Sequence, residues 1–322
     1  MSTTTVPANL QAKIYLAETL KEAKSKSFLN MFISEKGDSL VKLRKDPAKN
    51  PGDTMYIPLA MQLSADPILG DATAEGNEES QTMYEQSVTV QQKRFPWRSE
   101  GMNEEQKAAY SVREQAKWAL GERIAVYEDT QFFTKMGTTL TSGEVVWTGN
   151  NTAVGTIAAT DKLTLATIQK AKRAAKMHSP MIEPIMVDGK PLYIFFAHTY
   201  AMRDLWTDSA FLNAHYYANL RGDKNPIISG AEVLIDGVLI YEHNRVKWTT
   251  DGASSARVAY NFLAGKNCAV KAEAKAPFWK EKWFDYDNQL GILVGTHNTI
   301  EKSKYNSHDY GGLICPTGAA TD

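Results

Sequence analysis

Residues 54–63 read TMYIPLAMQL, and this stretch decides much of the fold because large apolar side chains alternate in it with polar or small ones. A period of two is that of a β-strand, and it places one row of apolar side chains on a single face: Met55, Ile57, Leu59, Met61 and Leu63. A second alternating run, from about 86 to 97, predicts a return strand. Pro58 and Pro96 favour edge positions for both strands, so the pattern predicts a long two-stranded ribbon.

Such a ribbon is marginally stable in water unless its apolar face packs on something. Two interpretations stay open from the residues alone: the ribbon folds back on its own core, or its apolar face packs on another subunit. Between the strands lies a polar stretch in which residues 66–85 hold six acidic side chains and neither Lys nor Arg. The sequence therefore predicts an acidic tip, which includes Asp71, Glu75, Glu78 and Glu79.

The N-terminal segment, residues 1–49, has the opposite charge. Nine Lys or Arg residues stand against five acids, a balance of 9 − 5 = +4, and Lys42, Arg44 and Lys45 lie close together near its end. Apolar residues at helical spacing early in the segment predict a helix on an arm. Its basic character is either an ordinary solvated surface or a means of docking on an acidic partner.

A long helix is predicted over 102–137, directly after the ribbon. Asn103 is a suitable N-cap, acidic residues follow in the first turn, and Lys135 with Gly137 forms a C-terminal signal. An apolar stripe runs along it: Ala109, Val112, Ala116, Leu120, Ile124 and Tyr127. At about 1.5 Å per residue the helix would be roughly 50 Å long, a length that indicates a structural strut.

The rest of the chain alternates helices and strands, so the fold class is α+β. Helices are predicted over 163–177 and 198–212, and a short apolar strand over 191–197. Residues 231–241 indicate a hairpin around Asp236-Gly237. Short strands separated by Gly- and Asn-containing turns continue to about 313.

Composition excludes several classes of protein. The 322 residues carry a formal net charge of −1, which is not the basic balance of a protein that grips nucleic acid through phosphate charge. Two cysteines cannot make a disulfide framework and favour reduced thiols in the cytoplasm. The start lacks a signal-peptide pattern, and no apolar run is long enough to span a membrane.

No motif of catalysis or metal binding stands out, so we predict no enzyme, cofactor or metal site. The six histidines do not fall at metal-ligand spacing. His198 precedes Arg203 and Asp204 on a predicted helix, so these three side chains are expected to form a local polar cluster. Such a cluster is more often structural than catalytic. The aromatic residues from Phe278 to Phe284 alternate with lysines, a pattern that fits a sheet core better than a nucleic-acid platform.

An ordered set of short stretches resembles the major capsid proteins of N-four-like podoviruses and their relatives. The most specific part runs from Leu192 to His243 and reads LYIFFAH, YAMRDL, NPIISG and VLIYEH in that order. Agreement continues at 51–53 (PGD), 75–79 (EGNEE), 285–287 (DYD) and 309–311 (DYG), although Asp287 stands where glycine is expected. The resemblance covers about 52–312.

This resemblance implies the Hong Kong 97-type capsid fold of tailed phages, with an arm, an extended loop, a spine helix, and peripheral and axial domains. The expected boundaries follow from the elements above: N-terminal arm 1–49, extended two-stranded loop 50–101, peripheral domain 102–160 with the spine helix at 102–137, axial domain 161–256, and a return to the peripheral domain over 257–322.

The function implied is self-assembly, in the host cytoplasm, of an icosahedral virion shell around double-stranded DNA. Hexamers and pentamers would form, with the extended loop lying across a neighbouring subunit, and the acidic tip would pair with the basic arm, including Lys42, Arg44 and Lys45. A separate scaffolding protein and a portal are the expected partners, with a decoration protein as a further candidate. DNA would be contacted non-specifically and no membrane would be involved. The alternatives are another virion component, such as a tail or decoration protein, and an enzyme with a dispersed site near His198 or His243.

Overall fold

The computed structural model describes residues 8–35, 37, 39–45, 54–102, 106, 111–138, 143–187, 189–213 and 233–319. The chain divides into two compact units, each built from three separate stretches. Unit 1 comprises 1–55, 89–135 and 270–301, and unit 2 comprises 56–88, 136–269 and 302–322. Among the described helices, none has the length and hydrophobicity needed to cross a membrane.

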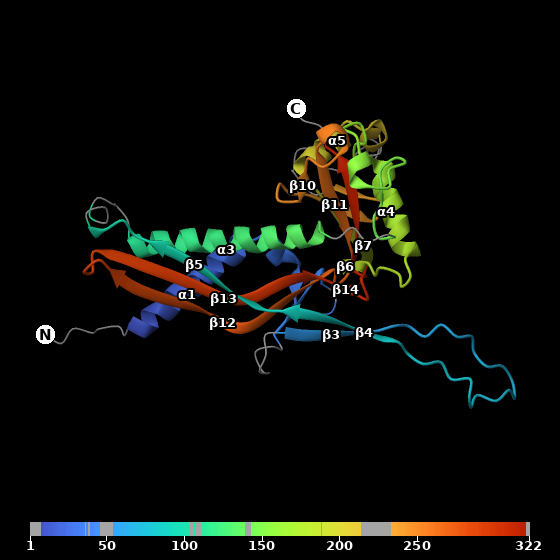
Figure 1. The fold of residues 1–322 in the computed structure, drawn as a ribbon, viewed down its shortest axis with the longest axis horizontal. Helices are drawn as coiled ribbons and strands as arrows, with labels where there is room; N and C mark the ends of the chain where they lie inside the picture. Colours follow the sequence, from blue (N-terminus) through green and yellow to red (C-terminus); the bar gives the residue numbers. More distant parts are fainter. Residues whose placement is uncertain are drawn as a thin grey trace. The chain divides into compact units, whose positions relative to one another are not determined.

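Unit 1 is a five-stranded sheet with two helices (Figure 1). The order of strands is β1-β2-β12-β13-β5, and β5 pairs antiparallel with β13, with Arg98 opposite Gly291. The elements are α1 (Ala8–Lys26), η1 (Leu29–Phe32), β1 (Ile33–Ser34), β2 (Val41–Arg44), β5 (Gln91–Arg98), α3 (Val112–Met136), β12 (Ala269–Phe284) and β13 (Gln289–Lys302). Pro96 lies in β5, at the edge of this sheet, as predicted.

The apolar stripe of α3 packs on the sheet, and α1 packs beside it. Ala116, Leu120 and Ile124 are buried in one cluster with side chains from α1 and the strands, including Ala23, Phe95, Trp279, Leu290, Ile292 and Val294. Burial of each large apolar side chain contributes roughly 1.5–3 kcal/mol. The close approach of α1 accounts for a glycine at position 121 of α3. An added Cβ there would lie 3.1 Å from the Thr19 carbonyl oxygen and 3.1 Å from Glu22 Cβ, both on α1.

The described part of the strut helix is shorter than the prediction of 102–137. It begins at Val112 and has 25 residues, or about 38 Å at 1.5 Å per residue. The predicted N-cap Asn103 lies outside the described residues. The helix ends at Met136, one residue before the predicted glycine stop.

Unit 2 is built around a seven-stranded sheet of order β10-β11-β7-β9-β8, with β16 on β11 and β6 on β7. Its helices are α4 (Leu165–Met177) and α5 (Thr199–Trp206). Its strands are β6 (Ile185–Val187), β7 (Lys190–Ala197), β8 (Val233–Ile235), β9 (Val238–Glu242), β10 (Trp248–Thr249), β11 (Val258–Ala264) and β16 (Gly312–Gly318). The core includes Ile168 of α4, Leu205 of α5, and Phe195 and Leu263 of the sheet.

Several local predictions in unit 2 are confirmed. Strand β7, helix α4 and the β8–β9 hairpin fall where the patterns placed them, and Ile235 faces Val238 across the turn. Asp236 and Gly237 adopt positive φ of 48° and 71°, the geometry of a tight hairpin turn. Helix α5 ends at Trp206, earlier than the predicted 212.

The structure divides the second half of the chain differently from the predicted boundary at 256/257. Strands β11 and β16 pair along seven residues and lie in the same sheet as β7 and β9, so 257–269 and 302–319 belong with unit 2. Residues 143–160 also belong to unit 2, because Val146 donates a backbone hydrogen bond to Ile314 and packs in that core. Only 270–301, the long β12–β13 hairpin, joins unit 1.

The observed ribbon also differs from the predicted one in its second strand. The predicted return strand, 86–97, is two strands: β4 (Met83–Thr89) pairs with β3 (Thr54–Ala60), while β5 pairs with β13. The break falls at Val90, whose side chain is buried. The prediction of one return strand over 86–97 is therefore wrong, because 91–98 pairs with β13 and not with β3.

Candidate assembly surfaces

The apolar face of the ribbon changes from buried to exposed along its length. Met55 and Ile57 are 8% and 6% exposed, Leu59 and Met61 are half-buried, and Leu63 is 53% exposed. The base of the ribbon thus packs within the chain, as the first interpretation held. The apolar face remains open only towards the tip, where Leu63 is followed by the exposed Ile68 and Leu69.

Beyond β3 and β4 the chain forms an extended loop, residues 61–82, which Figure 1 shows as two neighbouring strands of backbone without regular pairing. Two hydrogen bonds join the two ends of this loop. Met61 N–H donates to the Thr82 carbonyl at 2.9 Å, and the Gln81 side-chain amide donates to the Met61 carbonyl at 2.9 Å. Every residue from 62 to 82 is exposed. The loop is therefore ordered by polar contacts and has no core of its own.

Glu79 organises this loop. Its carboxylate accepts hydrogen bonds from the backbone N–H groups of Ser64, at 2.8 and 2.9 Å, and of Ala65, at 2.7 Å. These bonds hold the pKa of Glu79 below its usual value, because they favour the charged form. The sequence predicted Glu79 only as a member of the acidic tip, so its role in holding the loop was missed.

The other predicted acids differ from Glu79. Glu78 accepts a bond from the Gly76 backbone N–H at 2.8 Å, within its own turn. Asp71 and Glu75 are exposed. The carboxylates of Asp71, Glu75 and Glu78 are therefore more accessible to a partner than that of Glu79, which is bound to the backbone across the loop.

The predicted basic residues lie on β2 and just after it. Lys42 and Arg44 are half-buried on the strand, and Lys45 forms an ion pair with Glu35. The hydrogen bond to Glu35 raises the pKa of Lys45. Lys45 thus already has an acidic partner in its own chain, while pairing of this group with the acidic tip stays a prediction.

The unit 1 sheet also carries an apolar groove of about 520 Å³, which the sequence did not predict. It is lined by Pro96, Trp97, Ile292, Leu293 and Phe284, with Arg98, Lys280, Glu281 and Lys282 around it. The Phe284 ring lies over Gly291, where an added Cβ would come within 2.5 Å of it. Trp279 is buried in the core, so the core interpretation of this aromatic run holds for Trp279, whereas Phe284 lines an open surface.

His198 has a structural role. Its ring Nδ1 accepts from Tyr200 N–H and caps α5. The backbone N–H of His198 donates to Asn261 Oδ1, and the Asn261 amide in turn donates to Thr317 Oγ1. Burial lowers the pKa of His198, which keeps the ring neutral. Asp204 pairs instead with Lys162 and Arg203, so the predicted cluster forms without His198.

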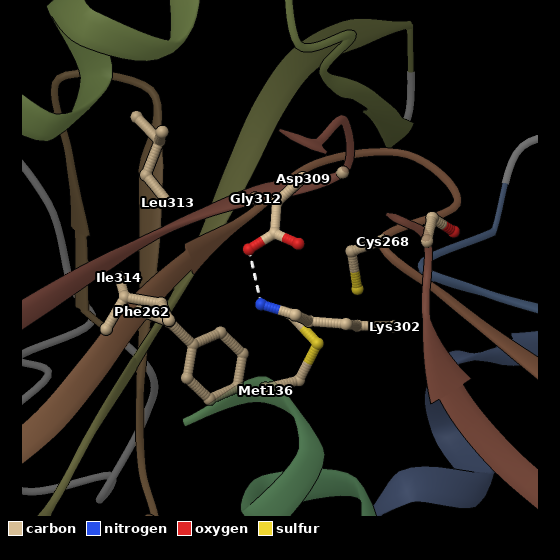
Figure 2. Close-up of a pocket in the computed structure, with 10 residues that line it drawn as sticks. Met136, Phe262, Cys268, Lys302, Asp309, Gly312, Leu313 and Ile314 are labelled. Carbon is tan, nitrogen blue, oxygen red and sulfur yellow. Dashed lines mark hydrogen bonds and ion pairs between the residues drawn. The ribbon is translucent and has the colours of Figure 1, made fainter. Parts of the chain in front are cut away.

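Two buried ion pairs lie inside the units. In unit 1, Lys271 contacts Glu128 at 2.9 Å; burial works against the charged lysine, but Glu128 and Glu273 outweigh it and raise the pKa of Lys271. In unit 2, Lys302 pairs with Asp309 in a small cavity (Figure 2). Within the described residues, no group of three or more potential metal ligands occurs.

Comparison with known proteins gives a consistent result. A family described as phage capsid protein matches residues 3–146 and 138–321. The major capsid protein of Pseudomonas phage KPP25 is 25% identical over 89% of this chain and 87% of its own length. Among solved structures, the capsid of Ralstonia phage GP4 is 22% identical and covers 92% of each chain, with a TM-score of 0.79. The capsid of cyanophage Pam1 is 23% identical over 92% of this chain and 93% of that one, with a TM-score of 0.80.

Proposed function

Because the chain belongs to the phage capsid protein family, we propose that it builds the shell of a phage head by laying its extended loop across a neighbouring copy. The fold is the Hong Kong 97-type capsid fold. The protein is a major capsid protein and its role is structural.

The observation that carries the proposal is the exposed, ordered tip of the ribbon. Leu63, Ile68 and Leu69 are 53%, 42% and 80% exposed on a loop with no core beneath it. A loop held by a specific clamp, Glu79, is organised before it meets a partner, which lowers the entropic cost of docking. Burial of the three apolar side chains would contribute roughly 1.5–3 kcal/mol each per contact between subunits.

Charge gives this contact its orientation. The tip is acidic and lacks basic residues, and the partner surface we propose is the basic arm of a neighbour, with Lys42 and Arg44. Paired charges at the rim of an interface contribute orientation and association rate more than affinity. The apolar tip residues supply the affinity.

Larger-scale organisation follows from the same proposal. Unit 1, with the spine helix α3, corresponds to the peripheral domain, and unit 2 corresponds to the axial domain near the centre of hexamers and pentamers in an icosahedral shell. Double-stranded DNA would lie inside and be contacted non-specifically, without the bulk electrostatic attraction of a strongly basic protein, because the net charge is −1. A separate scaffolding protein, a portal and a decoration protein are the further partners that we propose, with assembly in the host cytoplasm.

The test compares two sets of matched substitutions at exposed apolar residues. Leu63, Ile68 and Leu69 are changed to Ser in one variant; Met177, Met181 and Met186, which are 81%, 52% and 52% exposed on unit 2, are changed to Ser in the control. Each is co-expressed with the other head proteins, and particles are counted by sedimentation and electron microscopy. We expect folded subunits without shells for the loop variant and normal shells for the control. Normal shells from the loop variant would contradict the proposal.

A further inference from the structure

Gln86, on β4, joins the base of the ribbon to another part of unit 2 through its side-chain amide. Its Nε2 donates to the Lys302 carbonyl at 2.7 Å, and its Oε1 accepts from Lys304 N–H at 3.2 Å. These two backbone groups flank Ser303, where β13 passes into β14 (Lys304–Tyr305). The amide therefore binds the edge of this backbone with one donor and one acceptor, as a neighbouring strand would.

The backbone that Gln86 binds is itself held in place. On its other side, Ser303 N–H donates to the Cys268 carbonyl at 2.9 Å, and Ser303 Oγ donates to the Asn267 carbonyl at 2.6 Å. The Lys302 side chain is fixed by its buried ion pair with Asp309. Gln86 is thus attached to a fixed point in unit 2.

The rest of the ribbon, residues 54–89, makes its hydrogen bonds with itself. The Gln81 amide donates to the Met61 carbonyl, and Glu79 accepts from Ser64 N–H across the extended loop. Among the described residues, Gln86 is the one member of the ribbon that hydrogen-bonds outside it. The remaining hold on the base is apolar burial, which has no direction of its own.

A polar residue at this position selects one register. Ile57, Gln86 and Val88 share the inward face of the ribbon and are 6%, 9% and 0% exposed. Contacts near both ends of the strand pair fit a single register, in which Ile57 lies opposite Gln86. Apolar side chains alone would accept a slip by two residues, because the same face stays inward. A buried amide is costly unless its hydrogen bonds form, and they form in one arrangement only.

We propose that Gln86 is the positioning residue of the extended loop: it fixes the register and the direction in which the loop leaves β3 and β4 before it meets a neighbouring copy. This inference rests on the proposed function, because a fixed direction matters for assembly only if the loop docks. Figure 1 shows the two backbone stretches of the loop running out from these strands.

The length of the loop makes its direction sensitive to the base. Leu69 lies twelve residues beyond Ile57, so the chain between them spans at most about 40 Å at about 3.3 Å per residue. A rotation of about 10° at the base would then move Leu69 by roughly 7 Å. Apolar side chains are in contact only within about 4–4.5 Å, so such a rotation would separate the loop from its partner surface.

A distance measurement on the free, full-length subunit tests this role. Gln86→Met keeps an unbranched side chain of similar length and removes both hydrogen bonds. Gln81→Met is the matched control, since it is the same substitution at a glutamine whose amide bonds only within the ribbon. Spin labels at Thr73→Cys on the loop and Met177→Cys on α4 report the distance by electron paramagnetic resonance. The two native cysteines are buried and should take no label in the folded subunit.

We expect one narrow distance distribution in the labelled subunit, and the same distribution with Gln81→Met. Gln86→Met should shift or broaden it by roughly 7 Å, the displacement worked out above. Gln86→Glu keeps the acceptor for Lys304 N–H but loses the donor for Lys302, and should give an intermediate width. A broad distribution in the subunit that keeps Gln86 would overturn the proposal without any variant at that position, as would an unchanged distribution in a folded Gln86→Met subunit.

Assembly then separates this inference from the proposed function. Co-expression with the other head proteins should give fewer closed shells from Gln86→Met than from Gln81→Met. If Gln86→Met displaced the loop in the free subunit but shells formed normally, Gln86 would keep its positioning role and the docking of the loop on a neighbour would be contradicted.

Discussion

Removal of the Asp129 carboxylate should detach the segment after α1 from the spine helix. Asp129 lies in α3, is fully buried, and accepts three hydrogen bonds from the chain just beyond α1: from Ser27 Oγ at 2.8 Å and from the backbone N–H groups of Phe28 and Leu29 at 3.1 Å each. Two of these donors are backbone N–H groups, and a buried backbone N–H that loses its acceptor is costly.

The magnitude follows from these contacts. Hydrogen bonds to a charged group contribute roughly 1.5–3 kcal/mol each, so three give at least about 4.5 kcal/mol. The three share one carboxylate, and its removal also relieves the cost of a buried charge, so we expect Asp129→Ala to lower the free energy of unfolding of unit 1 by about 4 kcal/mol. Asp129→Asn keeps one acceptor oxygen for Ser27 and Leu29 and should cost roughly half as much, about 2 kcal/mol.

The assay is urea unfolding of the soluble subunit followed by tryptophan fluorescence, with hydrogen exchange read at Phe28 and Leu29. Glu122→Ala is the matched control, because Glu122 lies on the same helix and pairs with Lys26 at 3.6 Å on the surface. Exposed pairs of this kind contribute at most about 1 kcal/mol. If Asp129→Ala were no more destabilising than Glu122→Ala, the reasoning about this carboxylate would be refuted.

Three further predictions concern separate parts of the molecule. Because the pKa of Glu79 is lowered in the folded loop, the clamp should be fully present above the usual carboxyl range near 4.5 and be lost as pH falls through the lowered value. The loss should be seen as a fall in the protection of Ser64 N–H relative to its intrinsic exchange rate at each pH, and unchanged protection at low pH would contradict this. Cys268 and Cys315 are buried and burial raises the pKa of each thiol, so both should react with a thiol reagent only after unfolding, and rapid labelling of the native protein would be the contrary result. Gly121→Ala, which improves helix propensity by about 1 kcal/mol, should nevertheless destabilise the subunit in thermal unfolding because its Cβ meets α1 at 3.1 Å; a raised melting temperature would be evidence against that packing.

Periodicity predicted the elements that depend on local sequence. The alternation in 54–60, the stripe on α3 and the turn at Asp236-Gly237 each match the structure, because their hydrophobic period or turn residues are fixed locally, whereas residues 61–63 of the predicted strand lie in the loop. The resemblance to capsid proteins then predicted how these elements combine, and the family and fold comparisons confirm it.

Features that depend on long-range pairing were not predictable in the same way. The pairing of β11 with β16 joins residues about fifty positions apart, and nothing in either strand identifies the other. The β4–β5 break at Val90 follows from β5 pairing with β13, which alternation within 86–97 does not reveal. For this reason the two compact units divide the chain at other points than the predicted domain boundaries do.

The candidate assembly surfaces were likewise predictable only where local sequence decides them. Alternation identified the apolar ribbon residues, but only the structure separates the buried Ile57 from the exposed Leu63. Composition identified an acidic tip, yet the role of Glu79 depends on the backbone of Ser64, fifteen residues away. The contact of Lys302 with Asp309 depends on a hairpin whose turn residues, Asn306 and Ser307, were not singled out in the sequence.

The most direct test of the central claim is a cryo-electron microscopy reconstruction of particles formed when this chain is expressed with its head proteins. We predict closed shells in which the extended loop of one copy, with Leu63, Ile68 and Leu69 buried, lies across the next copy. Shells in which these residues face solvent, with copies joined through other surfaces, would contradict it.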